Sequence, residues 1–186
     1  ALVLDMDDAV YVRPTGPAGG GLQRKFEVTL RASDLVICGN LHLRETLRSR
    51  HPRVRLLPPA SPPPEVVPTP AVDTPVRLVW TGSEATLPYL ERLAPALEPL
   101  GGSVLLEVLA DGPPRLPASV PVSFTPWSLE AETTVLARAH IGLYPLDDEP
   151  WSLGKCAYKL HRYMQFGLPS VSSPHGGGRE VLGDEE

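Results

Sequence analysis

Three cationic side chains that could bind a diphosphate occur close together in the last third of the sequence. Lys155 and Lys159 are four residues apart, and Arg162 follows three residues later. If residues 155–166 form a helix that ends at Gly167, this spacing places the three cations on one helix face. Such a face suits a diphosphate, which accepts charge-assisted hydrogen bonds from several cations at once. The alternative interpretation is a solvated basic face with no ligand.

A glycine-containing turn offers a second candidate contact for phosphate. Gly82 and Ser83 follow the apolar run 76–80 and precede a region with helical periodicity. Bare backbone N–H groups at the start of a helix attract anions, and glycine lets an anion approach closely. The turn matches neither the GxGxxG nor the P-loop signature, so an ordinary strand-to-helix turn is the alternative interpretation.

Two other loops carry side chains that suit a sugar or a nucleobase. Gly176 and Gly177 follow the strand expected at 170–173, and Glu180 falls in the first turn of the next helix. A carboxylate there can accept hydrogen bonds from sugar hydroxyls, or it can simply stabilise the positive end of the helix dipole. Trp127 precedes another helix, where its indole could stack on a nucleobase or cover the core.

An acidic group follows the first predicted strand, at Asp5, Asp7 and Asp8. Carboxylates at a strand end can bind a metal, act as a nucleophile or cap a turn. No pair of Cys and His residues has the spacing of a zinc site, and no histidine lies in a Ser-His-Asp or HExxH motif. We therefore predict no bound metal.

Strands alternate with helices along the chain, and this alternation predicts an α/β fold with parallel sheets. In such sheets ligands bind beyond the carboxyl ends of the strands. Three predicted strands are each followed by a candidate site residue: 76–80 by Gly82, 141–146 by Asp147, and 170–173 by Gly176. We expect these three strand ends to share one edge of the sheet.

A proline-rich stretch separates two series of strands and helices. Residues 1–60 form the first series and residues 76–186 the second, and residues 61–75 are typical of an extended linker. The sequence opens directly in a strand-like run, and it stops where a helix is beginning. We therefore expect a fragment of a longer protein.

The composition narrows the classes of function. The chain of 186 residues has 17 Lys and Arg against 22 Asp and Glu, and this net charge of −5 argues against binding nucleic acid by bulk charge. No apolar run approaches the ~20 residues of a membrane span, and the acidic start argues against a signal peptide. Two cysteines provide no disulfide framework. These features predict a cytoplasmic protein.

The order of motifs in the second half resembles the carboxyl-terminal lobe of group 1 glycosyltransferases (glycosyltransferase family 4-like). The resemblance begins with VRLVWTGS at 76–83, continues through IGLYPL at 141–146, and includes the specific pattern KxxxKLxxYMxxGxPSVxS from Lys155. Upstream, DMDDAVY and ASDLVICGN are similar to the last third of the amino-terminal lobe of these enzymes. The resemblance implies the GT-B architecture, in which two Rossmann-like lobes face each other across a cleft.

The resemblance also implies roles for the phosphate-facing residues. Gly82 and Ser83 would face the phosphates of a nucleotide-sugar donor. Lys155 and Lys159 would offset the charge of the leaving diphosphate, which is the stabilisation that a transferase without a metal needs.

Other residues would contact the rest of the donor. By the same resemblance, Glu180, Gly176 and Gly177 would lie at the sugar or the diphosphate. We also expect donor contacts from Trp127 and from Arg162.

Two positions depart from the pattern of the family. Many relatives carry two Glu residues eight apart across the helix of the lysines, and the second contacts the donor ribose. Here these positions are Gly154 and Arg162. The departure favours a divergent branch or a lobe without catalysis.

We therefore expect a glycosyltransferase that moves a sugar from a UDP- or GDP-sugar to a carbohydrate or lipid-linked acceptor, in polysaccharide or glycolipid synthesis. It would need no cofactor besides this donor substrate and would bind no nucleic acid. It would work in the cytoplasm or at the inner face of the membrane, with any peripheral attachment made by parts outside this chain. Two alternatives stay open: a non-catalytic sugar-nucleotide-binding or scaffolding lobe, and a haloacid dehalogenase-like phosphohydrolase that begins at Asp5 and Asp7.

Overall fold

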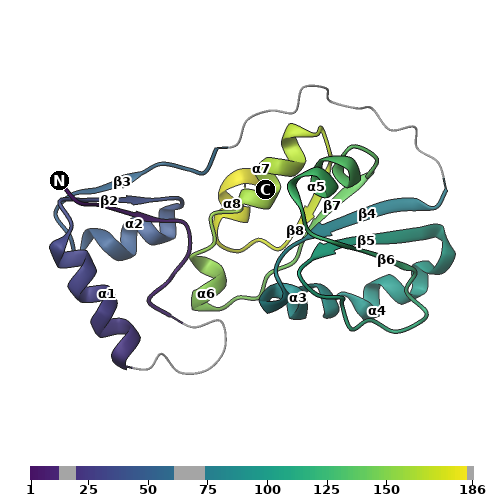
Figure 1. The fold of residues 1–186 in the computed structure, drawn as a ribbon, viewed down its shortest axis with the longest axis horizontal. Coiled ribbons are helices and arrows are strands. Elements are labelled where there is room, and N and C mark those ends of the chain that lie inside the picture. Colours follow the sequence, from purple (N-terminus) through teal and green to yellow (C-terminus); the bar gives the residue numbers. More distant parts are fainter. Residues whose placement is uncertain (13–19, 61–73, 184–186) are drawn as a thin grey trace. The chain divides into compact units, whose positions relative to one another are not determined.

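The computed structural model describes residues 1–12, 20–60 and 74–183, and the chain divides into two compact units. The first unit comprises Ala1–Ala60, Asp147–Tyr158 and Pro174–Glu186, and the second comprises Ser61–Leu146 and Lys159–Ser173. Each unit has its own parallel sheet (Figure 1). Most of the predicted proline-rich linker, residues 61–73, lies outside the described residues.

The sheet of the first unit has three parallel strands in the order β1-β2-β3: β1 (Val3–Met6), β2 (Leu35–Cys38) and β3 (Val54–Leu56). Helices α1 (Gly20–Ala32) and α2 (Leu41–Arg48) cover one face of this sheet (Figure 1). Both helices are amphipathic, so Phe26 and Leu30 of α1 pack with Met6 and Val36 of the strands in one hydrophobic core.

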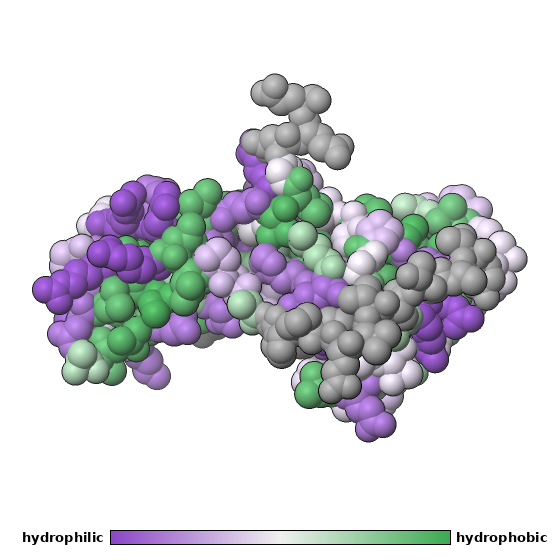
Figure 2. Space-filling view, turned by 90° about the horizontal axis from the view of Figure 1, so that it is seen from above, coloured by the Kyte–Doolittle hydropathy of each residue, from purple (hydrophilic) through white to green (hydrophobic). Residues whose placement is uncertain are grey.

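The other face of this sheet carries apolar side chains at the surface. Val3 is 48% exposed and Leu57 is 62% exposed, and hydrophobic residues reach the surface of the first unit in Figure 2. Parallel sheets are normally covered on both faces. Within the described residues, this sheet has a helical layer on one face only.

The second unit has five parallel strands in the order β6-β5-β4-β7-β8: β4 (Val76–Thr81), β5 (Val104–Ala110), β6 (Val122–Pro126), β7 (Ile141–Tyr144) and β8 (Ser170–Ser172). Strands β5 and β6 lie on one side of β4, and strands β7 and β8 lie on the other. The predicted parallel sheet is confirmed, and the strand ends expected to share an edge do so because β4, β7 and β8 all run in the same direction. The order reverses between β4 and β7, and ligands bind at such a switch point.

Proline divides the region of helical periodicity after Ser83 into short helical pieces. The region contains a 3-10 helix at Glu84–Thr86, α3 (Leu87–Glu91), α4 (Ala94–Leu97) and a second 3-10 helix at Glu98–Ser103. Pro88, Pro95 and Pro99 each stand in the first turn of one of the last three pieces. Proline fits a first turn but breaks a helix interior, so each one begins a new segment. Among the described helices, none combines the length and the apolar character that crossing a membrane requires.

The remaining helices are α5 (Leu129–Leu136), α6 (Pro150–Leu153), α7 (Tyr158–Gln165) and α8 (Gly177–Leu182). Helix α5 begins after Ser128, whose hydroxyl caps it by accepting a hydrogen bond from the amide of Ala131. Helices α6 and α8 belong to the first unit. The structure thus differs from the predicted single lobe over 76–186, because polar contacts tie residues 147–158 and 174–183 to residues 1–60.

Candidate functional site

Lys159 lies at the switch point of the second unit. Its ammonium nitrogen is 5.6 Å from the centre of the Trp80 ring and 5.9 Å from the centre of the Tyr144 ring. Trp80 is the second-to-last residue of β4, and Tyr144 is the last residue of β7. The structure therefore places one of the predicted catalytic cations at the carboxyl ends of the two strands that flank the reversal.

Tyr163, on the same helix as Lys159, ties α7 to both strands. Its hydroxyl donates to the carbonyl of Leu143 at 3.2 Å and accepts from the amide of Thr81 at 3.3 Å. Its ring fills the space beside Gly142, where a side chain would collide with it. Burial raises the pKa of the Tyr163 hydroxyl, which therefore stays protonated and able to donate. Lys159 is one turn away on a helix that this tyrosine anchors.

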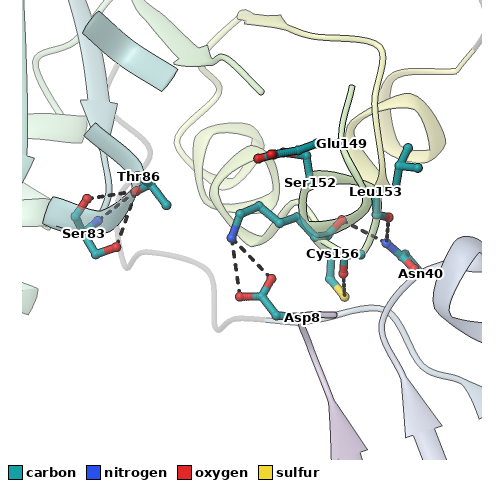
Figure 3. Close-up of polar contacts among 10 residues, drawn as sticks. Asp8, Asn40, Ser83, Thr86, Glu149, Ser152, Leu153 and Cys156 are labelled. Atoms are coloured by element: carbon teal, nitrogen blue, oxygen red, sulfur yellow. Dashed lines mark hydrogen bonds and ion pairs between the residues drawn. The ribbon is translucent and has the colours of Figure 1, made fainter. Parts of the chain in front are cut away.

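The turn at Gly82 and Ser83 differs from the expected bare phosphate loop. The amide of Gly82 donates to the carbonyl of Leu109 at 2.9 Å. The amide of Ser83 donates to the Thr86 hydroxyl at 3.2 Å, as Figure 3 shows. The next amide, that of Glu84, donates to the Asp111 carboxylate. The expectation of bare amides at Gly82 and Ser83 is therefore wrong. Glycine is required at position 82 because the Trp80 ring occupies the space of a side chain.

Arg162 is held inside the second unit. Its guanidinium makes an ion pair of 3.2 Å with Glu132 of α5, and each side chain is only 7% exposed. It also donates to the side chain of Gln165 at 3.0 Å and lies over the Phe166 ring. This pairing explains why an arginine is tolerated here, since a buried charge needs a partner.

Trp127 does not cover the core, which was the alternative interpretation of this residue. Its side chain is 53% exposed, and its amide donates to the carbonyl of Ala110 at 3.0 Å. It directly follows β6, at the carboxyl edge of the sheet. An exposed indole in this position offers a stacking surface.

Lys155 is not part of the helix that carries Lys159, so the prediction of one helix over 155–166 is wrong at its start. Helix α7 begins at Tyr158, and Ala157 has a φ of 56°. A left-handed conformation at a non-glycine residue interrupts a right-handed helix. The spacing of four residues therefore does not place both ammonium groups on one helix face, and the two lysines belong to different units.

In the first unit, Lys155 is nearly enclosed and paired with Asp8, which Figure 3 labels. Its side chain is 11% exposed, and its ammonium nitrogen lies 3.4 Å from both carboxylate oxygens of Asp8. The Trp151 ring centre is 5.0 Å away. Of the acidic residues Asp5, Asp7 and Asp8, Asp8 thus has a lysine as its partner. Among the described residues, no group of three or more His, Cys, Asp or Glu side chains could hold a metal ion.

Glu180 caps a helix of the first unit. Its two carboxylate oxygens accept hydrogen bonds from the amide of Leu41, at 2.8 and 3.0 Å, at the start of α2. Gly176 has a φ of 55°, which favours glycine, and it approaches the carbonyl of Ser152 too closely for a side chain. The predicted sugar-facing residues therefore pack the segment 174–183 onto the rest of the unit.

A cavity of about 730 Å³ lies beside Glu180 in the first unit. Its polar lining comes from α2, from α8 and from the loops that precede α6 and α8: His42, Asp148, His175, Arg179 and Glu180. The Nδ1 atom of His175 is 3.9 Å from Asp148. The cavity thus offers carboxylates that accept hydrogen bonds and an arginine that donates them.

Comparison with known proteins shows a likeness of fold. No protein-family model matches the chain, and no curated protein matches it. Among solved structures, the chain is similar to one titled "lipopolysaccharide outer core galactosyltransferase WaaB apo form", with a TM-score of 0.58 and 14% sequence identity. The fold is glycosyltransferase-like. The likeness covers 84% of this chain and 47% of the galactosyltransferase, so the chain spans about half the length of that structure.

This glycosyltransferase-like fold confirms the expected fold class, an α/β fold with Rossmann-like parallel sheets of the GT-B type. Sequence reasoning missed one residue that is central to its first unit. Asn40 is fully buried and forms hydrogen bonds with the backbone of residues 153 and 155. The only sequence signal was an Asn directly before a helix, which indicates a cap and says nothing of contacts 113 and 115 residues away.

Proposed function

We propose that the chain is the donor-binding part of a glycosyltransferase, and that the whole protein moves a sugar from a UDP- or GDP-sugar to a carbohydrate or lipid-linked acceptor. The observation that carries this proposal is the position of Lys159, whose ammonium lies over Trp80 and Tyr144 at the reversal of strand order. Doubly wound sheets bind their ligands at this point. The likeness to a galactosyltransferase supports the same class of reaction.

In this proposal, Lys159 stabilises the leaving diphosphate. Negative charge grows on the diphosphate as the bond to the sugar breaks, so a fixed cation favours the transition state over the ground state. The aromatic rings beside Lys159 exclude part of the water that would otherwise screen its charge. Trp127, exposed at the carboxyl edge of the same sheet, is our candidate for stacking on the nucleobase.

The first unit supplies further candidate contacts for the donor. We assign a second catalytic cation to Lys155, and hydrogen bonds to sugar hydroxyls to Glu180 and the cavity beside it. Hydroxyl groups suit this cavity because Asp148 can accept their hydrogen bonds and Arg179 can donate to them. Gly176 lines this cavity, and Gly176 and Gly177 let the chain approach the backbone of residues 152–157 closely.

The proposal is tested with the full-length protein. Binding of UDP, GDP, UMP and GMP is measured by calorimetry, and sugar transfer from a panel of UDP- and GDP-sugars is followed by mass spectrometry. We expect one diphosphate to bind more tightly than its monophosphate, and the matching sugar to be transferred. A protein that binds no nucleotide and releases no sugar from any donor would refute the proposal.

A non-catalytic sugar-nucleotide-binding lobe is the second candidate function. The observation that favours it is Arg162, which stands where relatives carry a ribose-binding Glu and is committed to its ion pair with Glu132. The same experiment separates the two candidates, because this alternative predicts nucleotide binding without transfer from any donor.

A further inference from the structure

Asn40 uses its whole side-chain amide to join distant parts of the first unit (Figure 3). Its Nδ2 group donates to the carbonyls of Leu153 at 2.9 Å and of Lys155 at 3.0 Å. Its Oδ1 atom accepts from the amide of Leu43 at 2.8 Å, which caps α2. The partners fix the orientation of the amide, because two carbonyls require donors and one amide requires an acceptor. The side chain is 0% exposed, so no water competes for these bonds.

The backbone held by Asn40 has an unusual conformation around Lys155. The carbonyl of Lys155 accepts a second hydrogen bond, from the amide of Gly177 at 2.8 Å. Two residues later, Ala157 has a φ of 56° and is only 1% exposed. A residue in this region of φ persists only where its surroundings determine it, and such residues gather at functional sites. Asn40 and Gly177 are the donors that specify the conformation here.

The ammonium group of Lys155 is fixed as well as its backbone. Its ammonium is paired with Asp8 and lies over the Trp151 ring. Gly154 packs directly against Ala9, so the segment is seated on the loop that carries Asp8. Lys155 is therefore held at its backbone by Asn40 and at its charge by Asp8. A mobile lysine would gain and lose this geometry continually, and a cation must be held in place to be effective in catalysis.

We propose that Asn40 is a positioning residue for Lys155: through the carbonyls of Leu153 and Lys155, it fixes the place from which the ammonium acts. This inference rests on the proposed function, which gives Lys155 its role toward the donor diphosphate. Asn40 touches no substrate, and its effect on the reaction passes through the lysine alone.

The decisive variant is Asn40→Asp. A carboxylate still accepts the hydrogen bond of Leu43 and remains a good helix cap, but when ionised it cannot donate to the two carbonyls. In the full-length protein, we expect kcat/KM for the donor to fall about tenfold or more, while the KM for the acceptor is unchanged. In a Lys155→Ala background the same change should alter kcat/KM less than about twofold, because the positioned group is already gone. Asn40→Ala, which loses the cap as well, should lower activity to the same extent as Asn40→Asp.

A second measurement does not depend on transfer. Amine acetylation, followed residue by residue with mass spectrometry, reports how accessible each lysine is. In the wild type, Lys155 should react slowly and the exposed Lys25 of α1 quickly. In Asn40→Asp and Asn40→Ala, the rate at Lys155 should rise several-fold and the rate at Lys25 should not change.

The outcomes separate this inference from the proposed function. A fall in kcat/KM that depends on Lys155, together with faster acetylation of Lys155, supports the inference. If both variants keep the wild-type acetylation rate, or if Asn40→Asp lowers activity equally with and without Lys155, Asn40 only stabilises the fold and the inference is wrong. If the wild type shows no transfer, the proposed function fails while acetylation still decides whether Asn40 positions Lys155.

Discussion

Lys159 offers the sharpest test of the proposed chemistry. Replacing it with Met keeps an unbranched apolar chain against Trp80 and Tyr144 and removes the ammonium, with its positive charge and its N–H donors. Because Tyr163 anchors α7 independently through Leu143 and Thr81, the helix should stay in place. The variant therefore isolates the ammonium from the packing.

The size of the effect follows from what the ammonium would do. Removing a preorganised group that stabilises developing charge costs about 3–4 kcal/mol where the site is well shielded, and about 2 kcal/mol is a reasonable lower value because Lys159 is only partly buried. At 1.36 kcal/mol for each factor of ten, this range corresponds to a fall of about 30- to 900-fold in kcat.

The assay is turnover of the full-length protein at saturating acceptor, with donor concentration varied. Lys25→Met, on an exposed position of α1 in the first unit, is the matched control and should change kcat less than about twofold. If Lys159→Met keeps a kcat within about threefold of the wild type, the ammonium does not stabilise the leaving group. The aromatic contacts of Lys159 would then be structural only.

Three further predictions concern stability and the role of single charges. Arg162→Met should lower the free energy of unfolding by about 3–5 kcal/mol, because it leaves the buried Glu132 carboxylate without its partner. Adding Glu132→Leu should recover most of this loss. Equal losses for the single and the double variant in urea denaturation would contradict this prediction. Burial raises the pKa of the Cys156 thiol from 9.0 to about 12, so its contribution to stability is complete below pH 9 and falls as the pH rises toward 12; urea midpoints across pH 7–10.5 should decline less in Cys156→Ala than in the wild type. Glu180→Gln should lower the free energy of unfolding by about 0.5–1 kcal/mol, since it removes a negative charge from the start of α2. Turnover should fall as well, because the proposed function gives Glu180 hydrogen bonds to sugar hydroxyls, and unchanged turnover would contradict that role.

The alternation of strands and helices was predictable because it depends on local patterns of apolar residues. The strand at Val76–Thr81, the cap at Ser128 and the parallel order of the second sheet all follow from such patterns and from the rules of βαβ connection. Lys159 was selected from the sequence for its spacing from Lys155 and Arg162, and its role toward a donor stays a prediction.

Other parts of the site depend on contacts between distant residues. The start of α7 was misplaced because Ala157 is an ordinary helix-forming residue whose positive φ is imposed by neighbours. The partner of Arg162 is on a different helix, 30 residues away, and the partner of Lys155 is 147 residues away. No spacing rule within one sequence reveals such pairs, so the sequence suggested free cations where the structure has paired ones.

The two units are interleaved along the chain, with boundaries after Ala60, Leu146, Tyr158 and Ser173. During synthesis, the first unit therefore lacks α6 and α8 until almost every residue of the second has been made. Until then, Asn40 lacks its partner carbonyl at Leu153, and the amide of Leu41 lacks its partner carboxylate at Glu180. The first unit is completed last although it begins first, which makes its folding a late and non-local event. Cutting the gene at the proline-rich stretch would separate residues 1–60 from the rest of the first unit, while the strands and helices of the second unit would stay together on one fragment.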